Sequence, residues 1–572
     1  MRPTSPHALA LGISQPPNEN HAVSVSLPTW HSIVSWSRRE PWVVSQMQGG
    51  YPRLFINSII QELSSRVLER LQPPDAEMGC MIMASMPAAL RLTKSLEAKK
   101  ADGFVSPCIH FGVPPTAAVD AQDKENSRWA AFHVVLYSSK LTPEAMSFWR
   151  ETGDGISSRH AEYALRWFPV LESQCADISF CTKPTMGPNE ARVEDLSPPL
   201  PPAATTAAQI AAMKSLLATS AASDDPGQAS ICPQDIFLYP KGLSGIYAVA
   251  RSLVPDAQPA QKSQAVIYGQ VFFRWPYAET VKCVERSGWD NVIIYGHGTE
   301  ADLDDLEGRL RSGERIQVLF CELPSNPQLA SPDLHRIRRL ADAYGFIVAC
   351  DETLGTFVNV DILPYVDIAM TSLTKIFSGA SDVMGGSVIV NRQSRFYQHV
   401  HSRLSATWED ILFPGDIGVL ASNCRDFAER VRYCSRSAST IATLVSKHPA
   451  VARVYYPTLV PSRPLYERYR RRDAGYGYVL SIIFHDPCSA VAFYDTLDVC
   501  KGTSIGANFT LAVPYAQLAH FRELDLAAAN GIPRHIVRIS VGIDDTQKLA
   551  DRVERALMAA ATIGRSALGP VS

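Results

Sequence analysis

The chain has 572 residues and is close to neutral, with 54 basic and 57 acidic side chains and a formal net charge of −3. This charge provides no basic field of the kind that holds a nucleic-acid backbone or an anionic membrane surface. Hydrophobic residues make up 46% of the chain and charged residues 19%, which is typical of globular proteins. We therefore expect roughly two or three folded domains and no nucleic-acid or membrane partner.

Two further features of the composition bear on the compartment. No segment approaches the ~20 consecutive apolar residues that a membrane-spanning helix needs. The 12 cysteines are scattered, without the paired spacing of a zinc site. We expect reduced thiols in a cytoplasmic protein that holds no metal.

The N-terminal part of the chain divides by composition. Residues 1–20 are rich in proline and asparagine and are predicted to be disordered. Residues 21–190 contain many aromatic side chains and are predicted to form a folded N-terminal extension. Residues 191–230 are dominated by proline, alanine, serine and threonine, which predicts a low-complexity linker.

After this linker, short apolar runs alternate with amphipathic helices, the pattern of a sheet covered by helices. Residues 231–395 are predicted to form an α/β domain, and residues 396–572 a smaller C-terminal α/β domain. One helix is predicted between two strands, with Ser331 as its cap and Gly345 at its end. The predicted strands of the larger domain are Ala265–Tyr268, Val292–Tyr295, Gln317–Cys321, Phe346–Cys350, Asp367–Met370 and Ser387–Val390.

A lysine and an aspartate follow two of these predicted strands. Lys375 comes after a buried strand, so we expect loss of solvation to lower its pKa, which suits amine or Schiff-base chemistry. Asp351 ends the preceding strand, where a carboxylate can keep a pyridinium nitrogen protonated. A lysine after a strand is usually a surface residue, and an aspartate there is often a helix cap. Their order together favours a pyridoxal phosphate (PLP) site.

A glycine turn at the start of the same domain is the third part of the predicted PLP site. Residues 239–251 read as a turn that opens a helix, and the free N–H groups of a helix N-terminus bind phosphate. Ser372 and Thr374, beside the lysine, can add hydroxyl donors. By itself such a turn is an ordinary helix cap, so its meaning depends on the lysine and the aspartate.

These motifs also resemble a known family. Ser372-Leu-Thr-Lys375 followed by Ser378-Gly-Ala-Ser-Asp382 is similar to the signature of the Cys/Met-metabolism PLP-dependent enzymes, and the chain resembles their fungal cystathionine γ-synthase-like branch over nearly its whole length. The resemblance implies a fold-type I PLP-dependent transferase. Such a protein has a large mixed-sheet domain, a smaller C-terminal α/β domain and, here, an N-terminal extension.

The resemblance further implies roles for individual residues. Lys375 bonds covalently to the cofactor and then carries protons, and Tyr268, also expected to be catalytic, stacks on the cofactor ring. Arg538 binds the substrate carboxylate, with Ser504 beside it. Arg159 is the nearest counterpart of a Tyr-Ser-Arg motif that reaches the neighbouring subunit's phosphate. The remaining cofactor contacts are Asp351 at the ring nitrogen, Asn326 near the phenolic oxygen, and Gly242, Leu243, Ser372 and Thr374 at the phosphate.

Three positions depart from the family pattern. In Ser157-Ser-Arg159, the subunit-bridging segment that the resemblance implies within residues 21–190, serine stands in place of the tyrosine. Phe509 occupies the place of a glutamate that commonly lies near the substrate site, and Glu352 follows Asp351 where asparagine is common. The loss of a carboxylate at position 509 bears on which second substrate the site accepts.

The implied function is a γ-replacement on an O-acylhomoserine, with cysteine as the nucleophile and cystathionine as the product. An alternative keeps the same vinylglycine-type chemistry but uses sulfide or a carbon nucleophile such as a β-keto acid, in a specialised pathway. A further alternative is an inactive relative that acts through its N-terminal region. The resemblance also implies small amino-acid substrates and a homo-oligomer, a dimer or a tetramer, with shared active sites.

Overall fold

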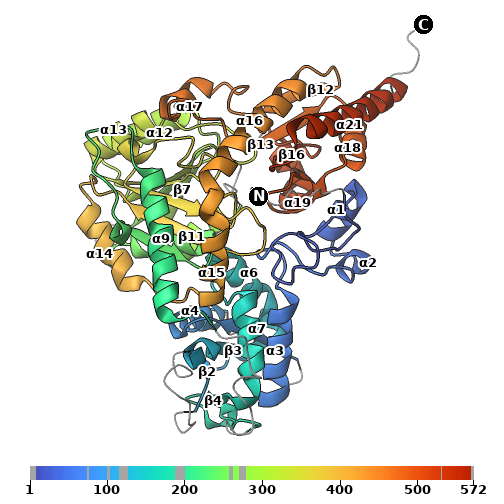
Figure 1. Ribbon diagram of the computed structural model, residues 1–572. Helices are drawn as coiled ribbons and strands as arrows, with labels where there is room; N and C mark the ends of the chain where they lie inside the picture. Colours follow the sequence, from blue (N-terminus) through green and yellow to red (C-terminus); the bar gives the residue numbers. More distant parts are fainter. Residues whose placement is uncertain are drawn as a thin grey trace. The chain divides into compact units, whose positions relative to one another are not determined.

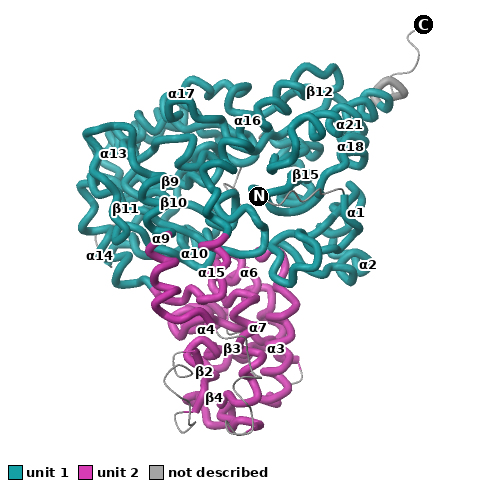
Figure 2. Tube along the Cα trace, in the orientation of Figure 1, with its two compact units in different colours: residues 1–51, 213–408, 423–572 teal, residues 52–212, 409–422 magenta. Residues whose placement is uncertain are grey.

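The computed structural model describes residues 8–73, 77–99, 103–114, 126–186, 200–256, 262–269, 278–529 and 531–567. The chain divides into two compact units (Figure 2). Unit 1 comprises residues 1–51, 213–408 and 423–572, and unit 2 comprises residues 52–212 and 409–422.

The larger sheet of unit 1 is a mixed sheet with the spatial order β5-β11-β10-β9-β8-β6-β7 (Figure 1). Strand β9 pairs in parallel with β8 and with β10, so the carboxyl ends of these three strands lie at one edge. Strand β11 runs antiparallel to both β5 and β10. The six strands predicted for this domain are all present, with ends that differ by at most two residues. The strands are β5 (Ile236–Tyr239), β6 (Gln264–Tyr268), β7 (Asn291–Tyr295), β8 (Val318–Glu322), β9 (Ile347–Asp351), β10 (Ile368–Ser372) and β11 (Gly386–Val390).

Helices pack against this sheet, as the alternating pattern predicts. Helices α10 (Gly242–Ser252), α11 (Ala278–Arg286) and α14 (Tyr397–Thr407) share one apolar core with alternate residues of the strands. Helix α13 (Leu334–Tyr344) packs against β9, and α12 (Glu300–Arg311) packs against α13. This arrangement confirms the α/β domain.

The N-terminal end of α13 differs from the prediction. Its N-cap is Asp333, whose carboxylate accepts a hydrogen bond from the Arg336 N–H at 3.0 Å, so the predicted cap at Ser331 is wrong. The cause is that the carboxylate at position 333 is the group that reaches the free N–H of the first turn. Gly345 ends the helix with a φ of +82°, as predicted.

The second sheet of unit 1 has the order β12-β13-β16-β15-β14. Its strands alternate with helices along the chain, the pattern expected of an α/β domain. Helices α18 and α21 pack against each other, and α16 packs against α21 and β12. The elements are α16 (Phe427–Ser446), β12 (Val451–Tyr455), α17 (Arg463–Tyr469), β13 (Val479–Phe484), α18 (Pro487–Thr496), β14 (Cys500–Lys501), β15 (Leu511–Pro514), α19 (Tyr515–Ala519), α20 (Leu524–Ala529), β16 (Val537–Ser540) and α21 (Thr546–Ala567).

The N-terminal segment of the chain belongs to unit 1 and is ordered from residue 8 onward. The prediction of disorder over residues 1–20 is therefore wrong for residues 8–20, while residues 1–7 lie outside the described residues. Backbone hydrogen bonds join Gly12 to Ser26 at 2.9 Å and Leu27 to Lys501 at 2.9 Å. The buried Lys501 ammonium donates to the Pro28 carbonyl at 2.9 Å. These backbone contacts order a segment whose composition resembles that of a flexible terminus. Two short helices follow, α1 (Trp30–Ser37) and α2 (Pro41–Val44).

Unit 2 contains an antiparallel sheet with the order β1-β3-β2-β4. Helices α3 and α7 pack together over an apolar core that includes strand residues of β1, β2 and β3. The predicted extension over residues 21–190 is thus divided, because residues up to 51 belong to unit 1. The elements of unit 2 are α3 (Ser58–Leu71), β1 (Met78–Met83), α4 (Met86–Glu97), β2 (Ile109–Gly112), β3 (Phe132–Ser138), α6 (Thr142–Thr152), α7 (Ser158–Trp167) and β4 (Glu172–Gln174), with most of α15 (Pro414–Asn423).

The predicted linker contains a helix, α9 (Ala203–Ala221). Residues 191–199 lie outside the described residues. The linker prediction is wrong for α9, because an alanine-rich sequence without internal proline or glycine has high helix propensity. Within the described residues, no helix is both long enough and apolar enough to cross a membrane.

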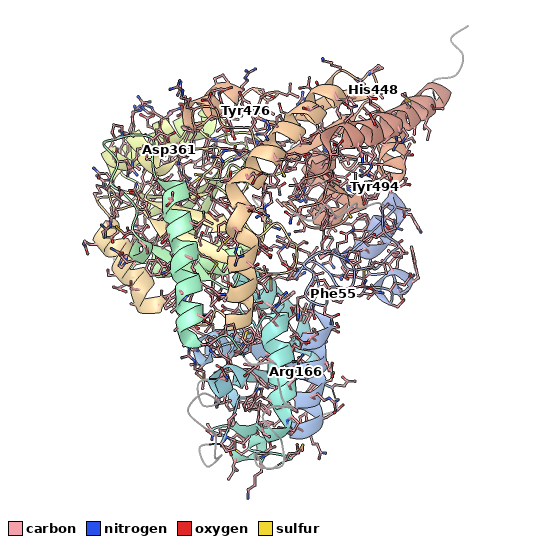
Figure 3. The ribbon with its side chains drawn as sticks, viewed as in Figure 1. Phe55, Arg166, Asp361, His448, Tyr476 and Tyr494 are labelled. Carbon is pink, nitrogen blue, oxygen red and sulfur yellow. The ribbon has the colours of Figure 1, made fainter. Side chains whose placement is uncertain are left out.

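Arg471 anchors the C-terminal end of α9. Its guanidinium donates to the Ala222 carbonyl at 2.8 Å, to the Asp224 carboxylate at 2.6 Å and to the Phe357 carbonyl at 2.7 Å. Asp361, labelled in Figure 3 near the same helix, accepts a hydrogen bond from the Asp224 N–H at 2.7 Å. A cation beside the terminal carbonyls of a helix is also favoured by the helix dipole.

We predict that Arg471→Ala lowers the free energy of unfolding by about 2–3 kcal/mol, because it removes several charge-assisted hydrogen bonds at once. The neighbouring Arg472 is a matched control, since its side chain is 96% exposed. Arg472→Ala is expected to change the free energy by less than about 0.5 kcal/mol. Urea unfolding of the two variants checks this, and equal effects would contradict the anchoring role.

Candidate active site

Lys375 lies buried in the turn that follows β10. Its Nζ donates to the Tyr51 hydroxyl at 3.0 Å and to the Ser504 hydroxyl at 3.4 Å. The ammonium also lies 4.3 Å from the centre of the Tyr51 ring. The side chain is only 7% exposed, so an amine here is removed from most of its solvent. The structure thus brings together the predicted Lys375 and Ser504 with a tyrosine that was not predicted.

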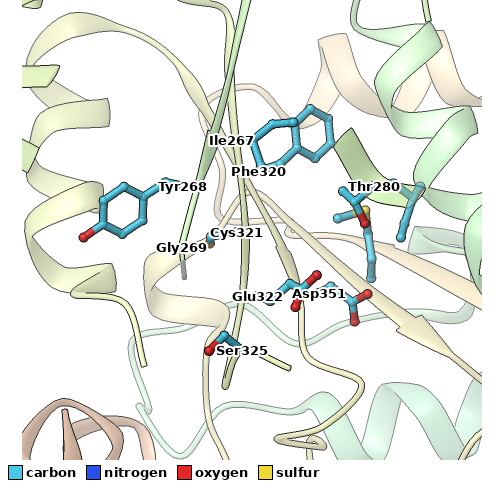
Figure 4. Close-up of a pocket in the computed structure, with 11 residues that line it drawn as sticks. Ile267, Tyr268, Gly269, Thr280, Phe320, Cys321, Glu322, Ser325 and Asp351 are labelled. Atoms are coloured by element: carbon cyan, nitrogen blue, oxygen red, sulfur yellow. The ribbon is translucent and has the colours of Figure 1, made fainter. Parts of the chain in front are cut away.

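Asp351 ends β9 at the edge of the sheet from which Lys375 also emerges. Burial raises the pKa of Asp351, while hydrogen bonds from Thr353 and the charge of Lys375 lower it. Glu322 is its register partner on β8, and both carboxylates line one pocket (Figure 4). The pocket therefore presents paired carboxylates near a buried amine.

The N-terminus of α10 lies beside Ser372. Helix α10 begins at Gly242 and has no side-chain cap, so no cap residue occupies its first-turn N–H groups. A Cβ on Gly242 would fall 2.7 Å from the Ser372 Cβ, so only glycine allows the turn to approach this closely. The turn, the Leu243 N–H and the Ser372 hydroxyl form a seat for an anion. The Lys375 N–H donates to the Ser372 carbonyl at 3.3 Å, which places the lysine one turn from this seat.

Two predicted cofactor contacts have other partners in the structure. The Thr374 hydroxyl donates to the Gly385 carbonyl at 3.3 Å and accepts from the Gly385 N–H at 3.1 Å, so its proton is not available to a phosphate. The Tyr268 hydroxyl donates to the Thr299 carbonyl at 3.1 Å, and its ring projects away from Asp351 (Figure 4). Tyr268 nevertheless lines the same pocket as Asp351. The phosphate contact of Thr374 and the stacking and catalytic role of Tyr268 stay predictions.

Arg538 on β16, Tyr515 at the start of α19 and Asn326 in the loop after β8 form a cluster in unit 1. The Arg538 guanidinium donates to the Asn326 amide oxygen at 3.1 Å and lies 4.7 Å from the centre of the Tyr515 ring. The Asn326 amide donates in turn to the Tyr515 hydroxyl at 3.1 Å. These neutral partners orient the guanidinium and leave its charge uncompensated by them.

Strand β16 connects this cluster with the lysine. Ser540, two residues after Arg538 and on the same face of β16, accepts a hydrogen bond from the Gly506 N–H at 2.8 Å. A Cβ on Gly506, whose φ is +70°, would lie 2.4 Å from the backbone nitrogen of Ile376. The loop that carries Ser504 is therefore packed directly against the turn that carries Lys375.

The predicted arginine contact lies in unit 2. Arg159 is near the start of α7 and pairs with the buried Asp416 at 3.3 Å. The contact of Arg159 with the phosphate of a neighbouring subunit stays a prediction. Tyr51 instead touches the lysine, and Tyr51-Pro-Arg53 preserves the Tyr-x-Arg spacing that Ser157-Ser-Arg159 lacks. That spacing is the signal that identifies Tyr51 from the sequence.

Phe509 does not line the lysine site. Its side chain is 4% exposed and packs in a small apolar cluster with Cys500, Ala507 and Leu511, against Leu9. Position 509 therefore supplies neither a carboxylate nor an aromatic wall to the pocket.

Comparisons with known proteins agree with this geometry. Residues 237–558 match the model of the Cys/Met metabolism PLP-dependent enzymes, and residues 59–157 match the N-terminal domain of fungal trans-sulfuration enzymes. The chain belongs to the Cys/Met-metabolism PLP-dependent enzyme family.

Individual relatives extend over almost the whole chain. It is 47% identical over 550 residues to the cystathionine gamma-synthase-like protein ankD of Aspergillus thermomutatus, which covers 96% of this chain and 94% of that protein. It is 34% identical to the cystathionine gamma-synthase of Neurospora crassa, covering 96% of this chain and 98% of that one. A solved structure of cystathionine gamma synthase from Xanthomonas oryzae pv. oryzae, in complex with aminoacrylate and cysteine, matches with a TM-score of 0.52 at 24% identity, over 62% of this chain and 86% of that one. The predicted fold-type I PLP-dependent architecture and the predicted cofactor are confirmed.

The residues of this member of the family fit PLP in their chemistry. An anion seat at Gly242, an amine at Lys375 and a carboxylate at Asp351 match the three charged or reactive parts of the cofactor. The close approach of Gly242 to Ser372 provides the cradle that a side chain would fill.

Glu352 lies next to Asp351 but is fully buried. Thr371 hydrogen-bonds one of its oxygens, while the other has no hydrogen-bond partner in the described structure. Burial raises the pKa of Glu352 well above its usual range, and the charge of Asp351 raises it further. We infer that this carboxyl is protonated in the folded protein.

The raised pKa has a defined consequence for stability. The folded protein binds the Glu352 proton more tightly than the unfolded chain does, so its contribution to stability is present below the unfolded pKa of ~4.3 and is lost as pH rises above it. Glu352→Gln copies the neutral acid and cannot ionise. We predict that its stability relative to the natural protein increases from about pH 5 to about pH 8.

Urea unfolding at the two pH values, with saturating cofactor, measures this difference. Glu352→Ala is the comparison variant and is expected to cost about 2–4 kcal/mol at either pH, because it opens a cavity at Thr371. A difference between Glu352→Gln and the natural protein that is independent of pH would contradict the inference.

Proposed function

We propose that the protein catalyses a γ-replacement on an O-acylhomoserine, with cysteine as the nucleophile and cystathionine as the product. The observation that carries this proposal is the buried Lys375 amine between two hydroxyls, with Asp351 at the end of β9 and Arg538 on β16 of the second sheet. The names of its relatives, a cystathionine gamma-synthase and a cystathionine gamma-synthase-like protein, support the same reaction class.

When bound, PLP supplies an electron sink for the negative charge that develops on the amino-acid substrate. Asp351 is proposed to hold the ring nitrogen in its protonated form. The N–H groups of Gly242 and Leu243 and the Ser372 hydroxyl are proposed to bind the phosphate. Asn326 is proposed to lie near the phenolic oxygen, where its contact with Arg538 joins the cofactor site to the substrate site.

Lys375 is proposed to anchor the cofactor and then to move protons between the α and β carbons of the substrate. Its amine is positioned for this by the Tyr51 and Ser504 hydroxyls, which fix Nζ from two different loops. A general base must lie within hydrogen-bond reach of the proton that it removes, so the rate of the reaction depends on this positioning of the amine. The surrounding burial excludes the water that would otherwise compete for the amine.

Arg538 is proposed to bind the substrate α-carboxylate. A guanidinium matches a carboxylate with two parallel hydrogen bonds, a geometry that an ammonium does not reproduce. Asn326 and Tyr515 orient the planar group for that contact.

We predict that Arg538→Lys raises the KM for the amino-acid substrate about 10–100-fold, with a smaller effect on kcat, because the paired hydrogen bonds are lost. Arg534→Lys is a matched control on the same segment, since Arg534 is half exposed and pairs with Asp525. Steady-state kinetics separate the two parameters. A kcat effect without a KM effect would exclude carboxylate binding by Arg538.

A second candidate function is the same reaction with sulfide or a carbon nucleophile such as a β-keto acid. The residue type at position 509 supports this alternative, because phenylalanine supplies no carboxylate for the ammonium group of an incoming cysteine. The two candidates share every step up to the entry of the nucleophile.

Competition between nucleophiles tests the proposal. The enzyme is incubated with O-acetylhomoserine and equal concentrations of cysteine, sulfide and acetoacetate, and the products are measured by mass spectrometry. We predict that cystathionine is the main product and that Lys375→Ala yields none of the products. A main product formed from sulfide or acetoacetate would establish the second candidate instead.

The quaternary state and compartment are part of the proposal. We propose a cytoplasmic homo-oligomer, a dimer or a tetramer, that acts on small amino acids, as the family resemblance implies. An inactive relative that acts through its N-terminal region is the remaining alternative. Absence of product with every nucleophile in the same assay would favour that alternative.

A further inference from the structure

Arg430, on α16, is a buried arginine that contacts the turn carrying Lys375. Its side chain is 4% exposed, and burial lowers the pKa of its guanidinium. Among the described residues, its hydrogen-bond acceptors are all neutral oxygens, although the negative charge of Asp426 also acts on it. A buried cation without a carboxylate partner requires a set of well-placed neutral acceptors.

Those acceptors belong to the residues that follow the lysine. The Arg430 Nε donates to the Ile376 carbonyl at 3.0 Å, and Nη2 donates to the Phe377 carbonyl at 3.0 Å. A third hydrogen bond runs from Nη2 to the Asn423 carbonyl at 2.8 Å. The guanidinium therefore fixes two consecutive carbonyls immediately after Lys375.

The same guanidinium also reaches the loop that carries Ser504. Its Nη1 donates to the Asn508 side-chain oxygen at 3.2 Å. The Asn508 N–H returns to the lysine turn by donating to the Gly379 carbonyl at 2.6 Å. Gly379 has a φ of +73°, and a Cβ there would lie 2.7 Å from the Arg430 Nε, so the turn is shaped closely around the guanidinium.

We propose that Arg430 is a positioning residue that sets the distance between Lys375 Nζ and the Ser504 hydroxyl. It joins the backbone of the lysine turn to the Ser504 loop through one planar group. The inference rests on the proposed role of Lys375 and adds to it the group that places the amine. Because the acceptors are arranged for a planar fork, a lysine at position 430 keeps the charge but not the geometry.

Two variants separate geometry from charge. Arg430→Lys keeps the positive charge but loses the planar, forked set of guanidinium donors. Asn508→Ala keeps Arg430 and removes only its contact with the Ser504 loop. Arg432→Lys is the matched control, because Arg432 lies on the exposed face of the same helix. The second variant also keeps the test decisive if Arg430→Lys does not fold.

Hydrogen exchange of the cofactor-free and the cofactor-bound protein is the first measurement. We expect the amides of Ser378, Gly379 and Asn508 to exchange about 10-fold faster in Arg430→Lys than in the natural protein, because local opening of the turn becomes easier. Arg432→Lys is expected to leave them unchanged. Unchanged exchange in Arg430→Lys would overturn the proposal, whatever the activity of the enzyme.

The absorbance of the bound cofactor as a function of pH is the second measurement. We expect its titration midpoint to shift by about half a pH unit or more in both Arg430→Lys and Asn508→Ala, since the Ser504 contact with Lys375 is altered. The kcat is expected to fall about 10-fold or more in both, with KM changed less than about 3-fold. A midpoint that stays unchanged in both variants would overturn the proposal. If the cofactor is not bound to Lys375 in the natural protein, the proposed function is refuted instead.

Discussion

The burial of one amine is the constraint on which this active site depends. Lys375 lies at 7% exposure, and an ammonium in such a place loses much of its hydration. Two neutral hydroxyls, from Tyr51 and Ser504, replace part of that hydration. The three residues are hundreds of positions apart in the chain, so the amine is satisfied only when the N-terminal segment, the large sheet and the C-terminal loop have all folded together.

The two acidic side chains Asp351 and Glu352 differ in their surroundings. Asp351 lies at the open edge of the sheet, where hydrogen bonds from Thr353 and the charge of Lys375 oppose the effect of burial on its pKa. Glu352, one residue further on, is fully enclosed and has one oxygen without a partner. Burial raises the pKa of both carboxyls, but at Asp351 the charge of Lys375 acts against this rise.

Local patterns were sufficient to predict the sheet and its reactive edge. Lys375 and Asp351 follow strands whose short apolar runs are clear in the sequence, and parallel strands have their carboxyl ends at one edge. Strand β5, which precedes the Gly242 turn, was not predicted. The contact of Tyr51 with Lys375 could not be read from local pattern, because it depends on a contact across 324 positions. The Tyr-x-Arg spacing at Tyr51 was the only feature of the sequence that indicated this contact.

Other differences come from hydrogen bonds that composition does not reveal. The Thr374 hydroxyl hydrogen-bonds Gly385 and the Tyr268 hydroxyl hydrogen-bonds Thr299, although Tyr268 also lines the pocket that holds Asp351. Helix α9 forms in a segment of linker composition because alanine favours helices. The Arg471 guanidinium also donates a hydrogen bond to the Ala222 carbonyl, directly after the helix. Propensity and motif order thus predict which elements exist, while the direction of each side chain depends on tertiary partners.

The central claim is that the buried Lys375 amine is the residue that holds the cofactor. Reduction of the holoenzyme with borohydride, followed by proteolysis and peptide mass mapping, tests it most directly. The account predicts a pyridoxyl phosphate group on the peptide that contains Lys375 and on no other lysine. The same group on a different lysine, or no modified peptide from protein that retains the cofactor, would contradict the account.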